Sequence, residues 1–284
     1  MEPIEILEIN KVKKSFNLAG IIPIAGYVNE YDTIWPDYLN PLNKGYYPFH
    51  KSVMECAFAG CDTIWIVCNH DYMNIIKKFI GHSVIDPVTY DRVYITKSGK
   101  KVYKRKTIPI MYVAMDNKYL LSCTIPFSAL YGAYSVKKLS NKISKWLKPD
   151  RYFISFMNQQ YSVNKLFEIR EQIKNEKPFF VSHNGKTVLD DCPSAFTIDN
   201  DDLFNILKWS KIKNNSSLQQ VFGKIKTEDS YLFEPEYCFD TKTWEGFREY
   251  MGSPHTEKHK TINSIFTDFK FKPLYKEKSR GNVR

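Results

Sequence analysis

The sequence lacks any apolar run long enough to cross a membrane, and it lacks internal repeats and low-complexity linkers. A membrane-spanning helix needs about 20 consecutive apolar residues, and no stretch of this chain reaches that length. The first residues include Glu2, Glu5 and Glu8 without a basic segment ahead of an apolar one, which is not typical of a signal peptide. We therefore expect a cytoplasmic protein in a reducing compartment, with no membrane partner.

The cysteines and histidines also lack the spacing that chemistry at such residues requires. Six cysteines are scattered among apolar neighbours without a C-x-x-C pair, as expected for buried free thiols. Cys56, Cys61, Cys68 and His70 could be grouped as a zinc site, but we expect Cys56 and Cys68 to face the core. The six histidines are dispersed, so the sequence predicts neither a Ser-His-Asp triad nor a cysteine nucleophile.

Positive charge is what the chain has in excess. The formal net charge is +10, and basic residues gather in residues 97–106 (KSGKKVYKRK) and in the last fifteen residues. A basic surface suits nucleic acid, phosphorylated ligands or an acidic protein partner. A solvated hairpin and a basic tail explain the same charge, and we favour them over nucleic-acid binding.

The first half of the chain alternates strands and helices. An apolar strand over residues 20–25 is followed by a helix over 50–59 that ends at Gly60, and by a second strand over 62–68. A helix over 72–80 follows, capped by Asn69 or Asp71 and closed by Gly81. Strands separated by helices with short loops indicate a parallel sheet with crossover helices.

The second half continues this pattern with interruptions. A basic hairpin turning at Ser98-Gly99 leads into a strand over 107–113 and a long helix over 127–147. The elements expected after it are a strand over 151–156, a helix over 163–173, a hairpin over 179–188 turning at Asn184-Gly185, a strand over 194–198, helices over 201–209 and 217–225, a strand over 237–240 and a helix over 243–251. We predict an α/β fold with a Rossmann-like mixed, mostly parallel sheet sandwiched by helices.

The domain organisation follows from these boundaries. Residues 19–251 form one α/β domain, preceded by an N-terminal arm over 1–18 and followed by a basic C-terminal arm over 252–284, in which His255 and His259 are exposed. Terminal arms of this kind order on neighbours in assemblies. Protein partners bound through the arms are therefore one expectation for this chain.

The loop over residues 26–42 is the first place to look for chemistry. In open α/β sheets, ligands bind just beyond the carboxyl ends of the strands, and the first strand ends at Gly26. The loop and the helix start after it are rich in aromatic residues, which suit stacking on a base or sugar, contact with a partner, or ordinary packing: Tyr27, Tyr31, Trp35, Tyr38, Tyr46, Tyr47 and Phe49.

Four blocks carry a resemblance to a known family. They are residues 20–26 (GIIPIAG), 36–42 (PDYLNPL), 53–69 (VMECAFAGCDTIWIVCN) and 237–246 (YCFDTKTWEG), with a weaker echo over 194–203. In this order they resemble the sugar-phosphate nucleotidyltransferases, which make nucleotide-sugars on the nucleotide-diphospho-sugar transferase fold. The resemblance spans residues 20–250 and implies that fold for the chain.

The resemblance also implies site residues and a cofactor. Family members bind Mg²⁺ through two aspartates, and the matching positions here are Asp240, in the terminal block, and Asn158, after the middle strand. A nucleotide or nucleotide-sugar would lie against the first strand and its loop. The implied nucleotide-binding residues are Ala25, Gly26, Tyr27, Asn29, Asp37 and Ser128.

Three departures from the family pattern fall in this region. The family's first loop is glycine-rich and carries an Arg that neutralises the departing pyrophosphate, whereas this chain continues with Tyr27, Val28, Asn29 and Glu30. The family's Lys in Pro-Lys-x-Leu is replaced by Asp37, and one metal-binding Asp is replaced by Asn158. These losses favour a degenerate active site.

Several hypotheses remain open on the sequence. The favoured one is a protein that keeps the fold and has a binding or structural role, in keeping with Lys-, Asn- and Tyr-rich usage like that of large bacteriophages, where it would be virion-associated. The alternative is an active sugar-1-phosphate nucleotidyltransferase that releases pyrophosphate, with Lys51, Lys44 or the 97–106 cluster replacing the missing cations. A glycosyltransferase of the same fold would need a metal motif, for which Asp199-Asn-Asp-Asp202 is the candidate, although it suits a helix cap better.

Overall fold

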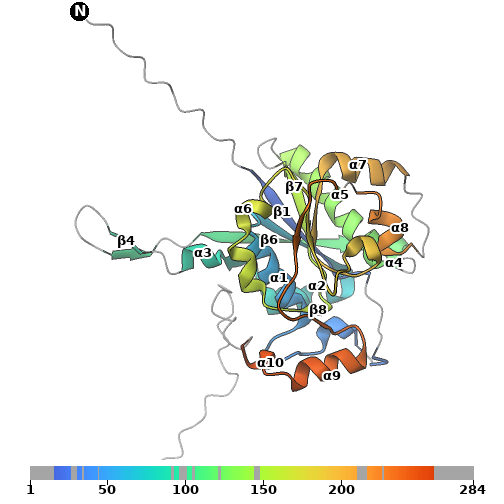
Figure 1. Ribbon diagram of the computed structural model, residues 1–284. Helices are drawn as coiled ribbons and strands as arrows, with labels where there is room; N and C mark the ends of the chain where they lie inside the picture. Colours follow the sequence, from blue (N-terminus) through green and yellow to red (C-terminus); the bar gives the residue numbers. More distant parts are fainter. Residues whose placement is uncertain are drawn as a thin grey trace, which may run out of the picture.

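One eight-stranded sheet with helices on both faces forms the body of the protein (Figure 1). The computed structural model describes residues 16–26, 31–33, 35–43, 45–90, 93–95, 101–103, 106–120, 123–143, 148–209, 216–225 and 227–258. The strands of this sheet run in the order β11-β9-β10-β7-β1-β2-β6-β3. They are β1 (Leu18–Pro23), β2 (Thr63–Asn69), β3 (Ser83–Ile85), β6 (Thr107–Met115), β7 (Arg151–Ile154), β9 (Phe179–Val181), β10 (Phe196–Asp199) and β11 (Tyr231–Phe233).

The centre of the sheet is parallel and its flanks are mixed. β1 pairs in parallel with β2 on one side and with β7 on the other, and β2 pairs in parallel with β6. β10 runs antiparallel between β7 and β9, and β3 runs antiparallel at the opposite edge. The predicted α/β class with a mixed, mostly parallel sheet is confirmed.

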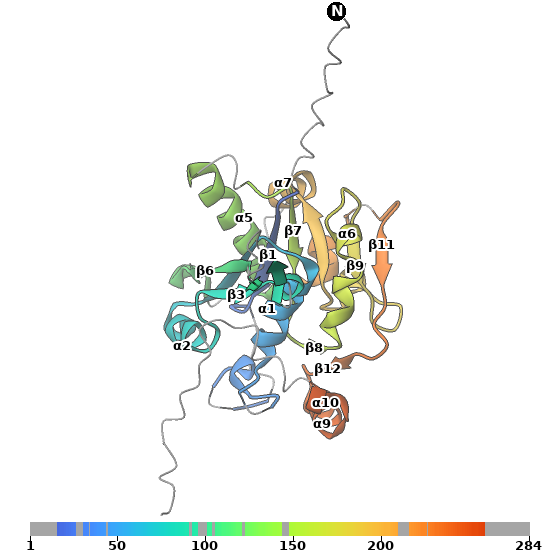
Figure 2. The same ribbon diagram turned by 90° about the vertical axis from the view of Figure 1, so that its left-hand side faces the viewer.

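Helices cover the sheet on both faces (Figures 1 and 2). Leu18 and Ile22 of β1 belong to one core cluster with residues of α1 and α2, while Ala19 and Ile21 belong to the other with residues of α5, α7 and α8. Alternate side chains of a strand point to opposite faces, so β1 is buried on both. The longer helices are α1 (Pro48–Ala59), α2 (His70–Ile80), α5 (Ile125–Ile143), α7 (Asn200–Trp209), α8 (Leu218–Phe222) and α9 (Trp244–Gly252).

Short elements complete the chain. Two small two-stranded sheets pair β4 (Val93–Ile95) with β5 (Lys101–Tyr103), and β8 (Gln159–Gln160) with β12 (Phe239–Asp240). The first pair confirms a hairpin within the basic excursion, although its turn lies outside the described residues. The remaining short helices are η1 (Asp37–Leu39), α3 (Pro87–Tyr90), α4 (Asn117–Leu120), η3 (Val163–Phe167), α6 (Arg170–Ile173), η4 (Val188–Asp190) and α10 (His255–Lys258).

Glycines that the sequence analysis singled out end the first two long helices. Gly60 closes α1 in the left-handed region at φ 87°, which only glycine adopts without strain. Gly81 closes α2 at φ 84°. Asn69 is the residue before α2, as one of the two predicted caps, but its side chain makes no capping hydrogen bond.

Some element predictions need correction. The helix expected over 163–173 is a 3-10 turn followed by the single turn of α6. Asn184 and Gly185 do form a tight turn, at φ 52° and 72°, but the hairpin stops at one bridge between His183 and Lys186 because the chain then enters η4. The sheet partner of β9 on that side is β10 instead.

Residues 252–258, which we predicted to begin a C-terminal arm, pack on the folded body instead. α10 belongs to the folded body, since Thr256 is buried and its hydroxyl donates to the Tyr250 carbonyl at 2.6 Å. His255 is stacked on Tyr237 with ring centroids 3.6 Å apart, so the prediction of an exposed His255 is wrong. Residues 1–15 and 259–284, where most of both predicted arms and His259 fall, lie outside the described residues.

His50 ties the start of α1 to the core and makes stability depend on pH. Its Nδ1 accepts the Tyr47 backbone N–H at 3.0 Å. Burial lowers the pKa of His50 to about 4, against a smaller opposing effect of the Phe79 carbonyl. As the pH falls, His50 therefore binds a proton near pH 6.5 in the unfolded chain but only near pH 4 in the folded chain.

We expect the free energy of unfolding to fall by up to about 3 kcal/mol between pH 7 and pH 4 through His50 alone. The measurement is urea unfolding at intervals over that range for the protein and for His50→Asn, which retains an acceptor for the Tyr47 N–H but does not titrate. The variant is less stable at pH 7, and its pH slope is flatter. Equal slopes for the two proteins would contradict the assignment.

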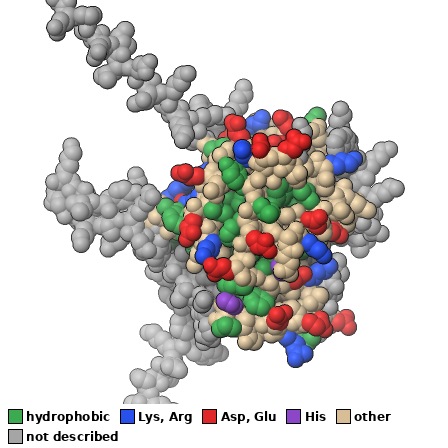
Figure 3. All heavy atoms as spheres, in the orientation of Figure 1, with side chains coloured by type: hydrophobic (Ala, Val, Ile, Leu, Met, Phe, Trp, Pro, Cys, Tyr) green, Lys and Arg blue, Asp and Glu red, His purple; other side chains and the backbone are tan. Residues whose placement is uncertain are grey.

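No helix among the described residues has both the length and the apolar character that crossing a membrane requires. Figure 3 shows acidic and basic side chains interspersed over the visible face, with hydrophobic groups between them. The coloured residues of this view form no continuous basic surface, so the view adds no support for nucleic-acid binding.

Candidate ligand-binding crevice

The sheet topology marks one place where a crevice must form. From β1 the chain moves to β2 and β6 on one side and only then returns to β7 on the other. The loop after β1 consequently leads toward β2, and the loop after the neighbouring strand β7 leads toward the other side of the sheet. The two loops part at the carboxyl ends of these strands, which is where α/β folds bind ligands. A cavity of about 390 Å³ lies there, within the size range of small-molecule sites.

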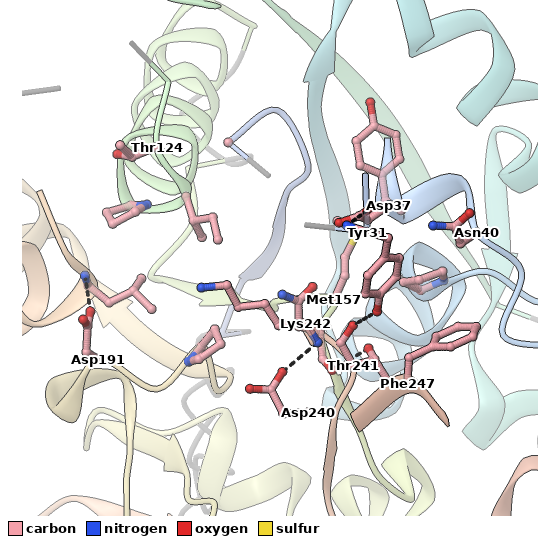
Figure 4. Close-up of a pocket in the computed structure, with 18 of the residues that line it drawn as sticks. Tyr31, Asp37, Asn40, Thr124, Met157, Asp191, Asp240, Thr241, Lys242 and Phe247 are labelled. Carbon is pink, nitrogen blue, oxygen red and sulfur yellow. Dashed lines mark hydrogen bonds between the residues drawn. The ribbon is translucent and has the colours of Figure 1, made fainter. Parts of the chain in front are cut away.

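Segments far apart in the sequence line this cavity, which we call the crevice (Figure 4). The loop after β1, the start of α5 and the segment after β7 contribute walls, and α8 and the β12–α9 segment close it. Its lining residues are Gly26, Tyr31, Asp37, Tyr38, Asn40, Leu42, Pro48, Cys123, Thr124, Ile125, Pro126, Met157, Asn158, Asp191, Pro193, Ser217, Leu218, Asp240, Thr241, Lys242 and Phe247.

Gly26 allows the turn after β1 to approach α5 closely. A Cβ at this position would lie 2.3 Å from the Thr124 carbonyl oxygen and 2.5 Å from the Ile125 nitrogen. Both are backbone atoms that cannot rotate away, so only glycine fits. Gly26, one of the predicted site residues, therefore lines the crevice and contacts the start of α5.

Asn158 and Asp240 meet through the small β8–β12 sheet. The Asn158 carbonyl accepts both the backbone N–H and the hydroxyl of Thr241, each at 2.7 Å. Asp240 Oδ1 accepts the Lys242 N–H at 2.9 Å, and within the described residues no other hydrogen bond engages the Asp240 carboxylate or the Asn158 side chain. The residues that the sequence paired as metal ligands thus both line the crevice.

This donor set suits Mg²⁺ only together with phosphate oxygens. Mg²⁺ prefers six oxygen ligands and is usually held by one or two carboxylates with substrate phosphates and waters. No group of three or more His, Cys, Asp or Glu side chains that could hold a metal is found among the described residues. Asp240 and Asn158 fit a cation that arrives with a phosphorylated ligand.

Tyr31 closes the loop after β1 against the C-terminal wall. Its hydroxyl donates to the Thr241 carbonyl, as the dashed line between these residues in Figure 4 shows. Its ring packs against both Trp244 and Phe247, with centroids 5.8 and 5.6 Å away. The loop thereby contacts a segment more than 200 residues later in the chain.

The charges of the crevice are mostly negative. Asp37, Asp191 and Asp240 line it, against Lys242 as the one cationic side chain among the described lining residues. Asp191 caps α8, because its Oδ1 accepts the Leu218 N–H at 2.7 Å. Asp37 begins η1 and accepts the Tyr31 N–H at 3.4 Å.

The other predicted site residues lie elsewhere. Ala25 and Ser128 are buried, and neither lines the crevice. Tyr27 and Asn29 lie outside the described residues. Asp191, Thr124 and Asn40 were missed, and no motif distinguishes them, whereas Thr241 and Lys242 directly follow Asp240 in the terminal block and could have been found there.

Lys51 is not presented to the crevice. It is 1% exposed and pairs with Glu55 through Nζ and Oε2 at 2.7 Å. Its Nζ also donates to the Phe156 carbonyl at 3.2 Å, while the hydroxyls of Ser155 and Tyr161 donate to Glu55. The prediction of Lys51 as a replacement cation for phosphate is wrong, because its charge is paired with Glu55 inside the core.

Asp199 to Asp202 form a helix cap, as the sequence favoured. Asp199 Oδ1 accepts the N–H groups of Asp201 and Asp202 at 2.9 and 2.8 Å. Because β10 runs antiparallel to β7, this cap lies next to Arg151 at the start of β7. The crevice lies at the other end of that strand. It gives no support to a glycosyltransferase metal motif.

Cys123 and Cys238 are poor candidates for a nucleophile. All six cysteines are free. Burial raises the pKa of Cys123, which lines the crevice, and of Cys238 to about 12. Both groups are therefore protonated at neutral pH, in agreement with the sequence analysis.

Comparisons with known proteins identify the fold. No family model and no curated protein matches the sequence. Among solved structures, a UDP-glucose pyrophosphorylase in complex with UDP-glucose is 12% identical, with 86% of this chain and 100% of that chain covered at a TM-score of 0.53.

Two further structures agree. A putative glucose-1-phosphate thymidylyltransferase from Bacillus anthracis is 9% identical, covering 84% of this chain and 94% of that chain at a TM-score of 0.52. A 4-diphosphocytidyl-2C-methyl-D-erythritol synthase from Anaerococcus prevotii is 14% identical, covering 83% and 95% at 0.51. The chain has a nucleotidyltransferase-like fold, as the resemblance implied.

Proposed function

We propose that this chain, with its nucleotidyltransferase-like fold, binds a nucleotide or nucleotide-sugar in the crevice through Mg²⁺-bridged phosphates and has lost efficient nucleotidyl transfer. One observation carries the proposal: the charged side chains among the described lining residues are three acids, Asp37, Asp191 and Asp240, and one base, Lys242. Asp37 stands where the resembled family has a lysine. A site built to stabilise a departing pyrophosphate needs the opposite balance.

The charge balance affects transfer more than binding. A carboxylate at ~4 Å from a phosphate oxygen costs on the order of 4 kcal/mol at an effective dielectric of about 20, before solvation reduces it. Phosphoryl-type transfer depends on cations that neutralise charge as it develops. An acidic crevice withholds that stabilisation, while a bound cation can still offset the repulsion in the ground state.

Different lining residues would hold the cation and contribute charge to the site. Mg²⁺, when bound, neutralises phosphate oxygens. Asp240 of β12 and Asn158, the residue before β8, would offer it oxygen ligands, and the hydrogen bonds from Thr241 to the Asn158 carbonyl hold these two segments together. Lys242 supplies a positive charge to the same wall of the crevice.

The test is the thermal stability of the protein with each common nucleoside triphosphate and with several nucleotide-sugars, with and without Mg²⁺. A ligand at 100 times its Kd adds about 2.7 kcal/mol of stability, seen as a higher Tm. We expect Mg²⁺-dependent stabilisation by at least one of these ligands and no release of pyrophosphate. Absence of stabilisation by any of them would overturn the proposal.

The variant Asp240→Asn distinguishes the contribution of the metal to ligand binding from that of the nucleotide itself. We expect it to weaken Mg²⁺-dependent ligand binding about 10–100-fold, as for other losses from a metal site, and to leave Mg²⁺-independent binding unchanged. Glu245→Gln is the control, since Glu245 is an exposed carboxylate of α9 that does not line the crevice. Equal effects of the two variants, measured by calorimetry, would argue against a metal at Asp240.

The alternative is an active sugar-1-phosphate nucleotidyltransferase. The position of Lys242 beside Asp240 favours it, because a lysine there could take over part of the missing positive charge. Pyrophosphate release from one nucleoside triphosphate with a sugar-1-phosphate, lost in Lys242→Met, would establish this alternative and overturn the loss of transfer.

A further inference from the structure

A second cavity opens beside the crevice. It has a volume of about 460 Å³ and is lined by Tyr31, Thr33, Asn40, Pro41, Trp244 and Phe247. Tyr31, Asn40 and Phe247 also line the crevice, so the two spaces share a wall. We call this second cavity the annex. A ligand with its phosphates in the crevice would have its next group within reach of the annex.

The annex is built around a fixed aromatic platform. The rings of Trp244 and Phe247, one turn apart on α9, are stacked 5.4 Å apart at 13°. Tyr31 meets the indole edge-on at 71° and is anchored by its hydroxyl to Thr241. Despite these contacts, Trp244 remains 53% exposed. Water-exposed indole held in place by its neighbours is a ready surface for a stacking ligand.

The annex differs from the crevice in its charge. Its six lining side chains include no acid and no base that is ionised at neutral pH, whereas the crevice carries four charged groups. The annex offers no opposite charge to an ionised group, whereas the crevice does. The annex therefore fits a neutral group.

Asn40 provides a polar contact at the shared wall. Its Oδ1 accepts the Trp35 indole N–H at 2.6 Å, which fixes the orientation of the amide. Its Nδ2 is buried and has no acceptor among the described residues. A buried donor without an acceptor costs free energy, so a ligand oxygen at this wall would relieve the cost.

We propose that the annex binds the neutral sugar ring of a nucleotide-sugar, stacked on Trp244 and hydrogen-bonded to Asn40, while the phosphates occupy the crevice. The position of the phosphates rests on the proposed function. The annex itself deepens that function by selecting nucleotide-sugars over free nucleotides.

A sugar suits this surface better than a nucleobase does. A pyranose carries C–H groups on its faces and hydroxyls around its rim, so one face can stack on a single exposed indole while the hydroxyls stay in water. A base is apolar over both of its faces, and stacking on one exposed indole would leave its second face in water, at a greater cost than for a sugar, whose rim of hydroxyls is hydrated.

The experiment compares matched pairs of ligands by calorimetry: UDP with UDP-glucose, dTDP with dTDP-glucose, ADP with ADP-glucose, and GDP with GDP-mannose. We expect one nucleotide-sugar to bind more tightly than its nucleoside diphosphate. In Trp244→Ala that advantage falls about tenfold, as loss of an aromatic contact predicts, while the nucleoside diphosphate changes less than twofold. Trp244→Phe retains part of the advantage.

Phe204→Ala is the control, because Phe204 is an exposed aromatic residue of α7 that lines neither cavity. It should leave every affinity unchanged. Equal losses for the nucleoside diphosphate and the nucleotide-sugar in Trp244→Ala would assign the platform to the base, and no loss for either would show that it is unused. Both outcomes overturn the proposal.

A second measurement separates this proposal from the proposed function. Saturation-transfer NMR with methyl α-D-glucoside and methyl α-D-mannoside needs no nucleotide. Signals that vanish in Trp244→Ala and persist in Phe204→Ala support the annex even if no nucleotide binds in the crevice. Nucleotide binding without any glycoside signal or nucleotide-sugar advantage would leave the proposed function intact and overturn the sugar site.

Discussion

Lys51→Met is expected to lower the free energy of unfolding by about 3–5 kcal/mol at neutral pH, the cost of leaving a buried charge without its partner. Glu55 is 0% exposed and its carboxylate is neutralised by Lys51 at 2.7 Å. Burial raises the pKa of Glu55, and Lys51 opposes that rise. Without the lysine the folded pKa of Glu55 rises further, so the folded variant binds a proton that the unfolded chain releases.

The pH dependence of this loss has a defined sign. A carboxyl group whose pKa is higher in the folded state destabilises the protein most above that pKa, so the deficit of Lys51→Met shrinks as pH falls toward 5. The double variant Lys51→Met/Glu55→Gln removes the charge, keeps an acceptor oxygen for one of the Ser155 and Tyr161 hydroxyls and offers its amide N–H to the other hydroxyl oxygen, and it should recover most of the stability. Urea unfolding at pH 8 and pH 5 measures both. A loss below 1 kcal/mol would contradict the buried pair.

The same variant tests where Lys51 acts. Because Lys51 does not line the crevice, the folded fraction of Lys51→Met should bind nucleotides with unchanged Kd. A selective loss of nucleotide affinity would instead place the lysine at the phosphates.

Gly246→Ala should disrupt both the C-terminal wall and ligand binding. A Cβ on Gly246 would lie 1.9 Å from the Asp240 carbonyl oxygen, closer than real Cβ contacts allow. The oxygen belongs to the backbone of β12, and the new Cβ would be held rigidly by the backbone of α9, so α9 must move away from β12 and take Phe247 and Trp244 with it. We expect a loss of about 1–3 kcal/mol from overpacking and at least tenfold weaker Mg²⁺-dependent nucleotide binding.

Gly252→Ala provides a matched control on the same helix. Its Cβ would meet nothing within 4 Å, and alanine restricts the unfolded chain more than glycine does, so the change should be neutral or stabilise by up to about 1 kcal/mol. Tm and calorimetric Kd values for the two variants decide the matter. Similar behaviour of both would contradict the close packing of α9 on Asp240.

Local sequence patterns predicted the fold because they reflect local physics. The run over 20–25 is apolar on both faces and became β1, and Gly60 and Gly81 ended α1 and α2 where a left-handed residue was needed. The antiparallel insertion of β10 between β7 and β9 was not predicted, because strand order depends on pairings that no local pattern encodes.

The candidate site was predicted only where a family block marked it. Gly26, Asp37, Asn158 and Asp240 do line one crevice, although they come from four separate segments. Lys51 was misjudged because its partner Glu55, four residues later, looks the same in sequence whether the pair is buried or exposed. Asp191 reaches the crevice through a left-handed turn, at φ 66°, that the sequence did not reveal.

The central position of β1 has a consequence for synthesis of the protein on the ribosome. β1 finds its neighbour β2 soon after emergence, but Leu18 must wait for its other neighbour, Arg151, and the Tyr31 contact with Thr241 must wait longer still. One edge of an apolar strand therefore stays unpaired during much of translation, which exposes nascent chains to aggregation. The ligand cannot assist early folding, since its binding walls are complete only when α9 has been made.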